Sequence, residues 1–301
     1  MTKFGRVIVW SVPLALYCGD ALAWGLYTHF YFAQLLLWAV PLADPHFRRA
    51  VRRFPGLLLA GACLPDVALF SSHARASELR VTHQWSAAHR LLRAATDDAE
   101  RALAVGYSSH LLTDVIAHNH FVPAHEALWF DARIMTHAAA EWAMDAHIAS
   151  HVFARPAHIL ERYLDVVAAY TARHFDCDIT ASRRAALYLL RGERTLRNVR
   201  LAQALYHGAR ALDRTLMRRF DYYARETAAR LAQIDRIIDG DAPVWRPEVE
   251  CARQARDGLR VQSVGTLAFR VPLPSDLFRT PRGSGIDNGV SDKPPAASGT
   301  P

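Results

Sequence analysis

The sequence predicts an all-α fold: a multi-helix bundle followed by a disordered C-terminal tail. Two observations support this prediction. Long stretches of the chain lack Gly and Pro and repeat apolar residues at steps of three and four, which is the period of an amphipathic helix. No stretch shows the apolar–polar alternation that is typical of a half-buried strand. Since 51% of the 301 residues are hydrophobic, such helices can bury a sizeable core.

The first segment, Met1–Ala23, is typical of a secretory signal peptide. Lys3 and Arg6 give it a positive start, residues 7–16 are largely apolar, and Ala21-Leu22-Ala23 provides the small-x-small pattern of a cleavage site. We therefore expect a secreted or periplasmic protein. The alternative is an uncleaved membrane anchor, although the apolar run is short for a spanning helix.

Cleavage after Ala23 would make Trp24 the first residue of the mature chain and would leave three cysteines, Cys63, Cys177 and Cys251. An odd number of cysteines does not describe a disulfide framework, and none of the three belongs to a Cys-x-x-Cys pair. A zinc site would therefore have to use histidines and carboxylates.

Helical periodicity runs through residues 24–243, which we predict to form one helical domain. In segment 86–104, for example, Leu91, Leu92, Ala95, Ala99 and Leu103 recur on one face. The expected helices are 31–40, 48–59 with a break at Pro55, 86–104, 106–118, 132–153, 157–174, 181–190, and 196–238 as two helices or one bent helix. The helices within 157–240 are rich in arginine. Residues 244–301 are predicted to be irregular to disordered, because residues 272–301 are rich in Pro, Gly, Ser and Asp and have few large apolar groups.

The distribution of histidine is unusual. The chain has 15 histidines, and all except His174 and His207 lie between His29 and His158. Surface histidines would not be expected to respect such a boundary, and neutral imidazole is the commonest protein ligand for zinc. The distribution therefore indicates metal binding in the first half of the chain. The formal net charge of +7, nearly all from arginine, suits an anionic partner.

The strongest metal-binding pattern lies in the helix expected over 106–118. His110, Asp114 and His118 stand at i, i+4 and i+8 and therefore project from one face. Leucine, valine and isoleucine occupy the other faces, so this helix is expected to be buried. A second helix repeats the pattern with His137 and Glu141. Buried ionisable groups need a partner, and metal ions are the simplest partner for two such helices packed together.

Further candidate ligands lie upstream. His29 follows Trp24 in the segment Trp-Gly-Leu-Tyr-Thr-His, and Asp66 follows Pro65 in a loop after an apolar helix. His83 lies just before the helix expected to start at residue 86. The sequence leaves His73 and His89 as alternatives to His83.

In their order along the chain, these residues resemble the metal ligands of the zinc-dependent phospholipase C family. The superfamily also includes the S1/P1-type nucleases and the catalytic domain of glycosylphosphatidylinositol-specific phospholipase D. The resemblance covers roughly residues 24–145 and implies the helical bundle of that family. It is based on the residues Trp24, His29, Asp66, His83, His110, Asp114, His118 or His120, His137 and Glu141. In the family the N-terminal amine and carbonyl of the Trp bind zinc, which agrees with a cleavage site directly before Trp24.

The resemblance implies up to three zinc ions. One would be held by Trp24, His29 and Asp114. A second would be held by Asp66, His83, His110 and the bridging Asp114, and the third by His118 or His120 together with His137 and Glu141. The spacing in bacterial phospholipases and nucleases favours His120, whereas helical phase and the phospholipase D-like spacing favour His118.

The resemblance also implies hydrolysis of a phosphodiester by a zinc-activated water, with Asp114 bridging two metals and Asp66 acting as a ligand or as the base that orients the water. The leading hypothesis is an exported phospholipase C that releases a phosphorylated head group from phospholipid, with contact to a membrane surface. No Gly-rich phosphate loop and no Gly-x-Ser-x-Gly motif is present, which weighs against a serine hydrolase.

Two alternatives remain at the level of sequence. A single-strand nuclease acting on nucleic acid would need stacking aromatics beside the zinc site, for which the candidates are Tyr107, Trp85, Trp129 and Phe130. A non-catalytic zinc-binding envelope protein would instead use its arginine-rich helices to contact anionic head groups. Alternatively, these arginines form a helix face that is simply exposed to solvent. The arginines concerned are Arg183, Arg184, Arg191, Arg194, Arg197 and Arg200. The oligomeric state is not encoded in any pattern we find.

Overall fold

The computed structural model describes residues 25–129, 133–247 and 273–279, with backbone alone at 133 and 134. All regular secondary structure within these ranges is helical, so the predicted all-α fold is confirmed. The predicted signal peptide, Trp24, Phe130, Cys251 and most of the predicted tail lie outside the described residues.

The helices follow one another with short connections. The order is α2 (Leu26–Trp38), α3 (Pro45–Arg53), α4 (Pro55–Gly61), η1 (Pro65–Phe70), α5 (Ser71–Ala74), η2 (Ser77–Val81), α6 (Trp85–Ala94), α7 (Asp98–Ile116), η3 (Ala117–Phe121), α8 (Val122–Leu128), α9 (Arg133–Ile148), η4 (Ala149–His151), α10 (Pro156–Arg162), α11 (Leu164–Phe175), α12 (Ile179–Asn198), α13 (Leu201–Leu212), α14 (Leu216–Leu231) and α15 (Ile234–Ile238).

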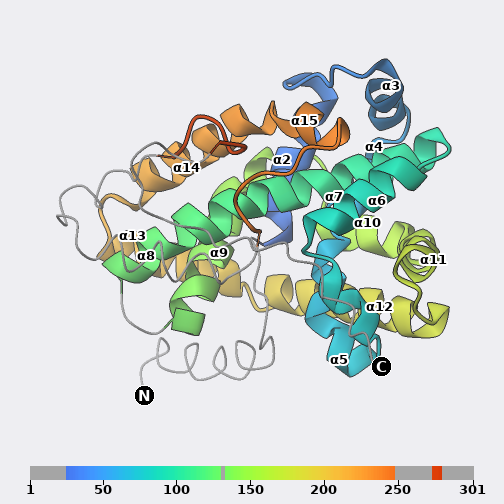
Figure 1. The fold of residues 1–301 in the computed structure, drawn as a ribbon. Coiled ribbons are helices and arrows are strands. Elements are labelled where there is room, and N and C mark those ends of the chain that lie inside the picture. Colours follow the sequence, from blue (N-terminus) through green and yellow to red (C-terminus); the bar gives the residue numbers. More distant parts are fainter. Residues whose placement is uncertain (1–24, 130–132, 248–272, 280–301) are drawn as a thin grey trace, which may run out of the picture.

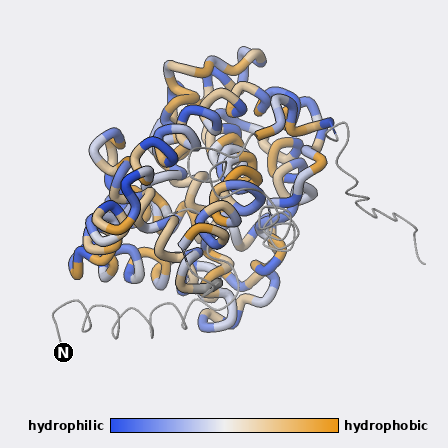
Figure 2. The backbone as a smooth tube through the Cα atoms, turned by 90° about the vertical axis from the view of Figure 1, so that its left-hand side faces the viewer, coloured by the Kyte–Doolittle hydropathy of each residue, from blue (hydrophilic) through white to orange (hydrophobic). Residues whose placement is uncertain are grey.

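The central element is α7, which crosses the middle of the molecule and continues through η3 into α8 (Figure 1). Every side chain of α7 from Ala102 to Ile116 is buried, because α2, α3, α4, α6 and α14 all pack against this helix. Helix α9 packs on α8, α13 and α2, and α12 packs on α11 and η1. Most of the surface helices contain both hydrophobic and hydrophilic residues along their length, as expected of amphipathic helices that pack one face on a core (Figure 2).

Two glycines let α4 and α7 approach backbone to backbone. A Cβ atom on Gly61 would lie 2.2 Å from the Leu103 carbonyl oxygen, and one on Gly106 would lie 2.0 Å from the Leu58 carbonyl oxygen. Both distances are far shorter than a van der Waals contact, so only glycine fits at either crossing point. The close approach places the residues that follow α4 directly beside the middle of α7, where His110 lies.

The expectation of one helix over 86–104 is wrong, because the chain breaks between α6 and α7. Asp97 accepts a hydrogen bond from the backbone N–H of Glu100 at 2.9 Å, and the Glu100 carboxylate accepts one from the N–H of Thr96 at 3.0 Å. This reciprocal arrangement satisfies amide groups at a helix start and defines the N-terminus of α7. Gly106 then lies inside α7 and does not begin a helix.

The stretch 196–238 also divides differently from the expectation of two helices or one bent helix. Its first residues complete α12, and three further helices follow. The break after α12 occurs at Arg200, whose φ of 53° lies in the left-handed region. The break after α13 occurs at Asp213, whose carboxylate accepts from the Thr215 backbone N–H at 2.9 Å.

Part of the segment predicted as a tail contacts the bundle. The Val244 N–H donates to the Leu277 carbonyl at 3.0 Å, and the Leu277 side chain is fully buried. The Trp85 indole N–H donates to the Trp245 carbonyl at 3.0 Å. In the described part of the chain, no single helix is long and apolar enough to cross a bilayer, whereas the bent pair Pro55–Gly61 and Pro65–Ala74 meets those criteria by length and composition.

Candidate metal centre

Six segments bring histidines and carboxylates together in the interior of the bundle. His29 comes from the first turn of α2, Asp66 from the start of η1, and His83 from the turn before α6. Helix α7 contributes His110 and Asp114, η3 contributes His118, and α9 contributes His137 and Glu141. None of these eight residues is more than 8% exposed. They form three groups whose ligand atoms lie within 4.8 Å of one another: His29 with Asp66 and His110, His83 with His110 and Asp114, and His118 with His137 and Glu141.

Asp114 lies between histidines from different segments. Its Oδ1 atom is 3.3 Å from His29 Nε2, and its Oδ2 atom is 3.0 Å from His110 Nε2 and 3.6 Å from His83 Nε2. The carboxylate therefore presents one oxygen to each of two sets of imidazole nitrogens. A carboxylate placed in this way has one oxygen available to each of two cations.

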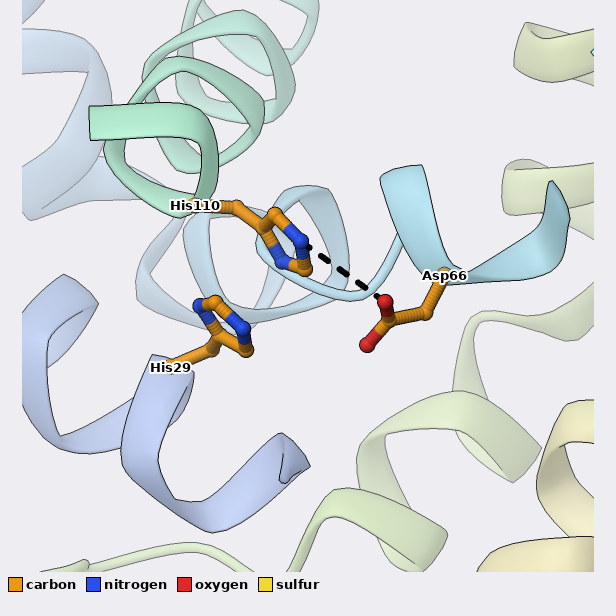
Figure 3. Close-up of side chains that lie close together, drawn as sticks. All are labelled: His29, Asp66 and His110. Carbon is orange, nitrogen blue, oxygen red and sulfur yellow. Dashed lines mark ion pairs between the residues drawn. The ribbon is translucent and has the colours of Figure 1, made fainter. Parts of the chain in front are cut away.

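Asp66 faces two of the same histidines. Its Oδ1 atom is 3.7 Å from His110 Nε2 and 3.8 Å from His83 Nε2. Figure 3 shows Asp66 facing the His110 ring, with the ring of His29 lying parallel to that of His110. The alternatives His73 and His89 lie elsewhere: His73 is exposed on α5, and His89 Nε2 lies 2.9 Å from the Asp241 carbonyl.

The third group combines η3 with α9. His137 Nε2 is 2.9 Å from Glu141 Oε1, and the rings of His118 and His137 have centroids 5.2 Å apart. His120 is buried outside this group, with its ring 5.1 Å from that of Trp245. The chain at 117–121 forms a wider π-helical turn, a feature often found at functional sites. The structure therefore brings His118, and not His120, into contact range of His137 and Glu141.

Hydrogen bonds on the far side of two rings fix their tautomers. The His110 Nδ1–H donates to the Ala62 carbonyl at 2.8 Å. His29 Nδ1 lies 3.2 Å from Thr113 Oγ1, and this hydroxyl donates its own proton to the His110 carbonyl. Thr113 must therefore accept from His29 Nδ1–H. With a cation bound, both rings would present an unprotonated Nε2 to it, as metal-binding histidines do.

Burial shifts the pKa values in the directions expected of a site that needs cations. It raises the pKa of Asp66 to about 7, with Asp114 adding to the shift and His110 opposing it. It lowers the pKa of His83 to about 3, assisted by the nearby His110. Burial also raises the pKa of Glu141 well above its usual range and lowers that of His118 well below. Only at His110 do Asp114 and Asp66 outweigh burial, raising the pKa to about 9.

The donor set and its spacing fit zinc. Nitrogen and oxygen ligands about 2.0–2.2 Å from a tetrahedral zinc lie roughly 3.3 Å from each other. The distances between paired histidine and carboxylate ligand atoms run from 2.9 Å for His137 and Glu141 to 3.8 Å for His83 and Asp66. Both oxygens of Asp114 and of Glu141 are buried, and the groups that face Asp114 Oδ2 and Glu141 Oε1 at 3.0 and 2.9 Å are histidine nitrogens. Bound cations would balance these buried carboxylates.

Comparison with known proteins agrees with this chemistry. Residues 28–228 match the family model described as zinc dependent phospholipase C. The chain belongs to the zinc-dependent phospholipase C family. No curated protein and no solved structure matches the chain.

Of the zinc ligands predicted from the sequence of this phospholipase C family member, the structure brings together His29, Asp66, His83, His110, Asp114, His118, His137 and Glu141. The residues that sequence reasoning missed lie behind them. Thr113 and the Ala62 carbonyl orient histidine rings, and Asp145 contacts the start of α2. Asp145 continues the four-residue spacing of His137 and Glu141, so the helical period could have indicated it.

The aromatic candidates for a stacking surface are engaged elsewhere. Tyr107 is fully buried and donates its hydroxyl to the Thr82 carbonyl. The Trp129 indole N–H donates to Asp213 at 3.1 Å, and that of Trp85 donates to the Trp245 carbonyl. These contacts give the three rings a packing role.

Several of the α12 arginines are likewise paired within the chain. Arg183 contacts Asp165 at 2.7 Å, Arg194 contacts Glu161 at 2.5 Å, and Arg197 contacts Asp145 and Glu193. These partners offset the charge of three of the six arginines considered as a docking surface.

Proposed function

We propose that this protein is an exported zinc-dependent phospholipase C, which hydrolyses the phosphodiester bond of a phospholipid and releases a phosphorylated head group. The observation that carries the proposal is the position of Asp114, whose two carboxylate oxygens face His29 on one side and His83 and His110 on the other. A carboxylate shared between two cation sites suits a phosphoryl group that must be held at more than one oxygen. Membership of the zinc-dependent phospholipase C family supports the same reaction class.

The ligand sets follow from the three groups. His29 and Asp114 would hold one zinc together with Trp24, which lies outside the described residues. Asp66, His83 and His110 would hold a second zinc with Asp114. His118, His137 and Glu141 would hold a third. When bound, zinc supplies Lewis acidity that lowers the pKa of a coordinated water and neutralises charge on phosphoryl oxygens.

The protein side chains position the reacting groups. Asp66 lies at the junction of two ligand groups, and its Oδ1 atom faces both His83 and His110. From there its carboxylate can accept a hydrogen bond from the attacking water and hold it in line with the phosphorus, or it can act as a metal ligand. His110 is fixed from behind by the Ala62 carbonyl, so its Nε2 keeps its direction during turnover.

Export is a further part of the proposal. The signal pattern of Met1–Ala23 ends directly before Trp24, and α2 begins at Leu26, three residues before His29. Cleavage after Ala23 would free an amine two residues before the start of the helix that contributes a ligand. Amino-terminal sequencing of the exported protein should therefore give Trp24 as its first residue.

The decisive experiment compares substrates on the zinc-loaded protein. Vesicles of phosphatidylcholine, phosphatidylethanolamine or phosphatidylglycerol are incubated with it, and the release of water-soluble phosphorylated head group is measured beside cleavage of single-stranded DNA. We expect release of head group from at least one lipid and none with Asp114→Asn. Cleavage of DNA alone would make the protein a nuclease. A zinc-loaded protein that cleaves neither would be a non-catalytic zinc-binding protein, and the proposal would be wrong.

A further inference from the structure

Helix α2, which carries His29, begins without a capping side chain of its own. Its N-cap residue is Gly25, and no side chain near it in sequence accepts from the first N–H groups. The cap is supplied by Asp145 of α9. Its Oδ1 atom accepts from the Thr28 backbone N–H at 2.9 Å and from the Thr28 hydroxyl at 2.8 Å, and its Oδ2 atom lies 3.4 Å from the Tyr27 N–H. A carboxylate is the group best suited to the positive end of a helix.

The glycine at position 25 makes room for that carboxylate. Its φ of −61° is one that any residue adopts, so the backbone does not require glycine. A Cβ atom at position 25 would lie 2.2 Å from Asp145 Oδ2 and 2.6 Å from Oδ1. Gly25 and Asp145 therefore depend on each other: the Asp145 carboxylate occupies the space that a side chain at position 25 would fill.

A third helix holds the carboxylate in place. Arg197 of α12 forms an ion pair with Asp145 Oδ2, and its Nε–H donates to Glu193 Oε1 at 2.7 Å. The same guanidinium lies over the Tyr27 ring, 4.4 Å from its centroid. Asp145 is fully buried, so this arginine balances its charge away from solvent.

The position of Asp145 connects two parts of the metal centre. On α9 it follows His137 and Glu141 at intervals of eight and four residues, so all three side chains project from the same face. On α2 it binds Thr28, the residue directly before His29. Any displacement of the α2 start relative to α9 would move His29 relative to the group formed by His118, His137 and Glu141.

We propose that Asp145 is a positioning residue that couples the α2 and α9 parts of the metal centre by capping α2 across the bundle. The inference rests on the zinc centre of the proposed function. In this role, the contacts among Gly25, Asp145 and Arg197 set the distance between His29 on α2 and the ligands on α9 before zinc binds.

A double-mutant cycle on the full chain tests the coupling. Zinc affinity is measured by competition with a chromophoric chelator, and the Co²⁺-substituted protein is examined by absorption spectroscopy. We expect Asp145→Ala to weaken the binding of at least one zinc by roughly 10- to 100-fold, the usual effect of losing a residue behind the ligands. Asp145→Asn, which keeps an acceptor oxygen for Thr28, should lose less. It also provides the measurement if the alanine variant fails to fold.

The glycine supplies the second arm of the cycle. Gly25→Ala should weaken zinc binding in the wild-type background, because the new methyl group displaces the carboxylate. In the Asp145→Ala background the three atoms nearest to that methyl group are gone, so the added effect of Gly25→Ala should be much smaller than in the wild-type background. The matched control is Asp98→Asn, which removes an arginine-paired carboxylate at the start of α7 and should leave zinc affinity unchanged.

The metal-free protein provides a readout that does not depend on the proposed function. Hydrogen exchange at the Thr28 amide should accelerate in Asp145→Ala and in Gly25→Ala. Wild-type zinc affinity and Co²⁺ spectra in both Asp145 variants would overturn the coupling, even if lipid is hydrolysed. A full effect of Gly25→Ala in the Asp145→Ala background would overturn the pairing of these two residues. Failure to hydrolyse any phosphodiester would contradict the proposed function and leave the coupling measurable.

Discussion

The imidazole rings of His29 and His110 are stacked, with centroids 3.6 Å apart and planes 10° from parallel. The stack brings α2 against α7 and directs the two Nε2 atoms to different oxygens of Asp114. Two protonated rings in such contact would repel each other, whereas two neutral rings can each donate a lone pair to a cation. Cation binding would therefore require both rings to be neutral, and Asp114 is the carboxylate that both rings face.

Replacing Asp114 should abolish activity. Asp114→Asn keeps the shape of the side chain but removes the negative charge and one acceptor oxygen from between the histidine sets. Loss of several kcal/mol of transition-state stabilisation would lower kcat/KM by about 10³-fold. Steady-state hydrolysis of vesicles measures the change, and Asp98→Asn is the control because its carboxylate is paired with arginines far from the centre. Turnover of Asp114→Asn within tenfold of wild type, roughly 1.4 kcal/mol, would contradict the bridging role.

His118 and His120 should differ in their effect on zinc content. His118 lies with His137 and Glu141, whereas His120 packs against Trp245. We expect His118→Ala to lose one zinc per chain after dialysis and His120→Ala to keep the wild-type content. Elemental analysis of the two variants decides between them. The reverse pattern would show that His120 is the ligand and that the turn at 117–121 rearranges around the metal.

Removal of zinc should lower the melting temperature. The buried ligands of the centre lose the cations that balance them, and a ligand present at about 1,000 times its Kd contributes roughly 4 kcal/mol to the folded state. For a chain of this size that corresponds to about 6 °C. Calorimetry with and without a chelator measures the shift, and added zinc should reverse it. An unchanged melting temperature would mean that the groups are stable without metal.

The stability of the fold should fall in acid partly because of His125. This ring donates its Nδ1–H to the Phe121 carbonyl at 2.7 Å and accepts from Arg219 Nε–H at 3.0 Å, and burial lowers its pKa well below the ordinary 6.5. Below about pH 6.5 the unfolded chain protonates His125 while the folded chain does not. The unfolded state then binds more protons than the folded state. The free energy of unfolding therefore falls by up to about 1.4 kcal/mol for each pH unit of acidification.

His125→Gln tests this assignment. Its amide can donate to Phe121 and accept from Arg219, yet it does not titrate. Urea unfolding between about pH 5 and about pH 7.5 should give the variant a shallower loss of stability than wild type. His46→Gln, at an exposed position on α3, is the control and should keep the wild-type slope. Parallel curves for wild type and His125→Gln would show that His125 does not contribute.

The crossing of α4 and α7 should not tolerate a methyl group. Gly106→Ala would place its Cβ 2.0 Å from the Leu58 carbonyl oxygen and force the helices apart, at a cost of about 1–3 kcal/mol. Denaturant unfolding measures this loss. Gly192→Ala is the matched control, because its Cβ would lie 3.3 Å from the edge of the Phe70 ring, and alanine favours a helix by about 1 kcal/mol. A Gly106→Ala protein as stable as wild type would contradict the tight crossing.

Sequence periodicity predicted the fold class and the main ligand positions because both depend on the 3.6-residue helical repeat. His110, Asp114 and His118 fall on one face of a buried segment, and His137 and Glu141 repeat the spacing. The same reasoning failed at the break between α6 and α7, where Thr96, Asp97 and Glu100 form hydrogen bonds that interrupt an otherwise continuous apolar pattern. Local capping there outweighed periodicity.

The sequence by itself determined which residues could bind a metal, since residue type and helical phase are local properties. Only the tertiary structure places His118 beside His137 and Glu141, and His83 beside His110 and Asp114, because these neighbours depend on which segments lie side by side. Only packing revealed that Asp145 caps α2, because its partner Thr28 is distant in the sequence and adjacent in the fold. A carboxylate that caps a helix from across the bundle leaves no signal near that helix, because the residue it requires there is a glycine.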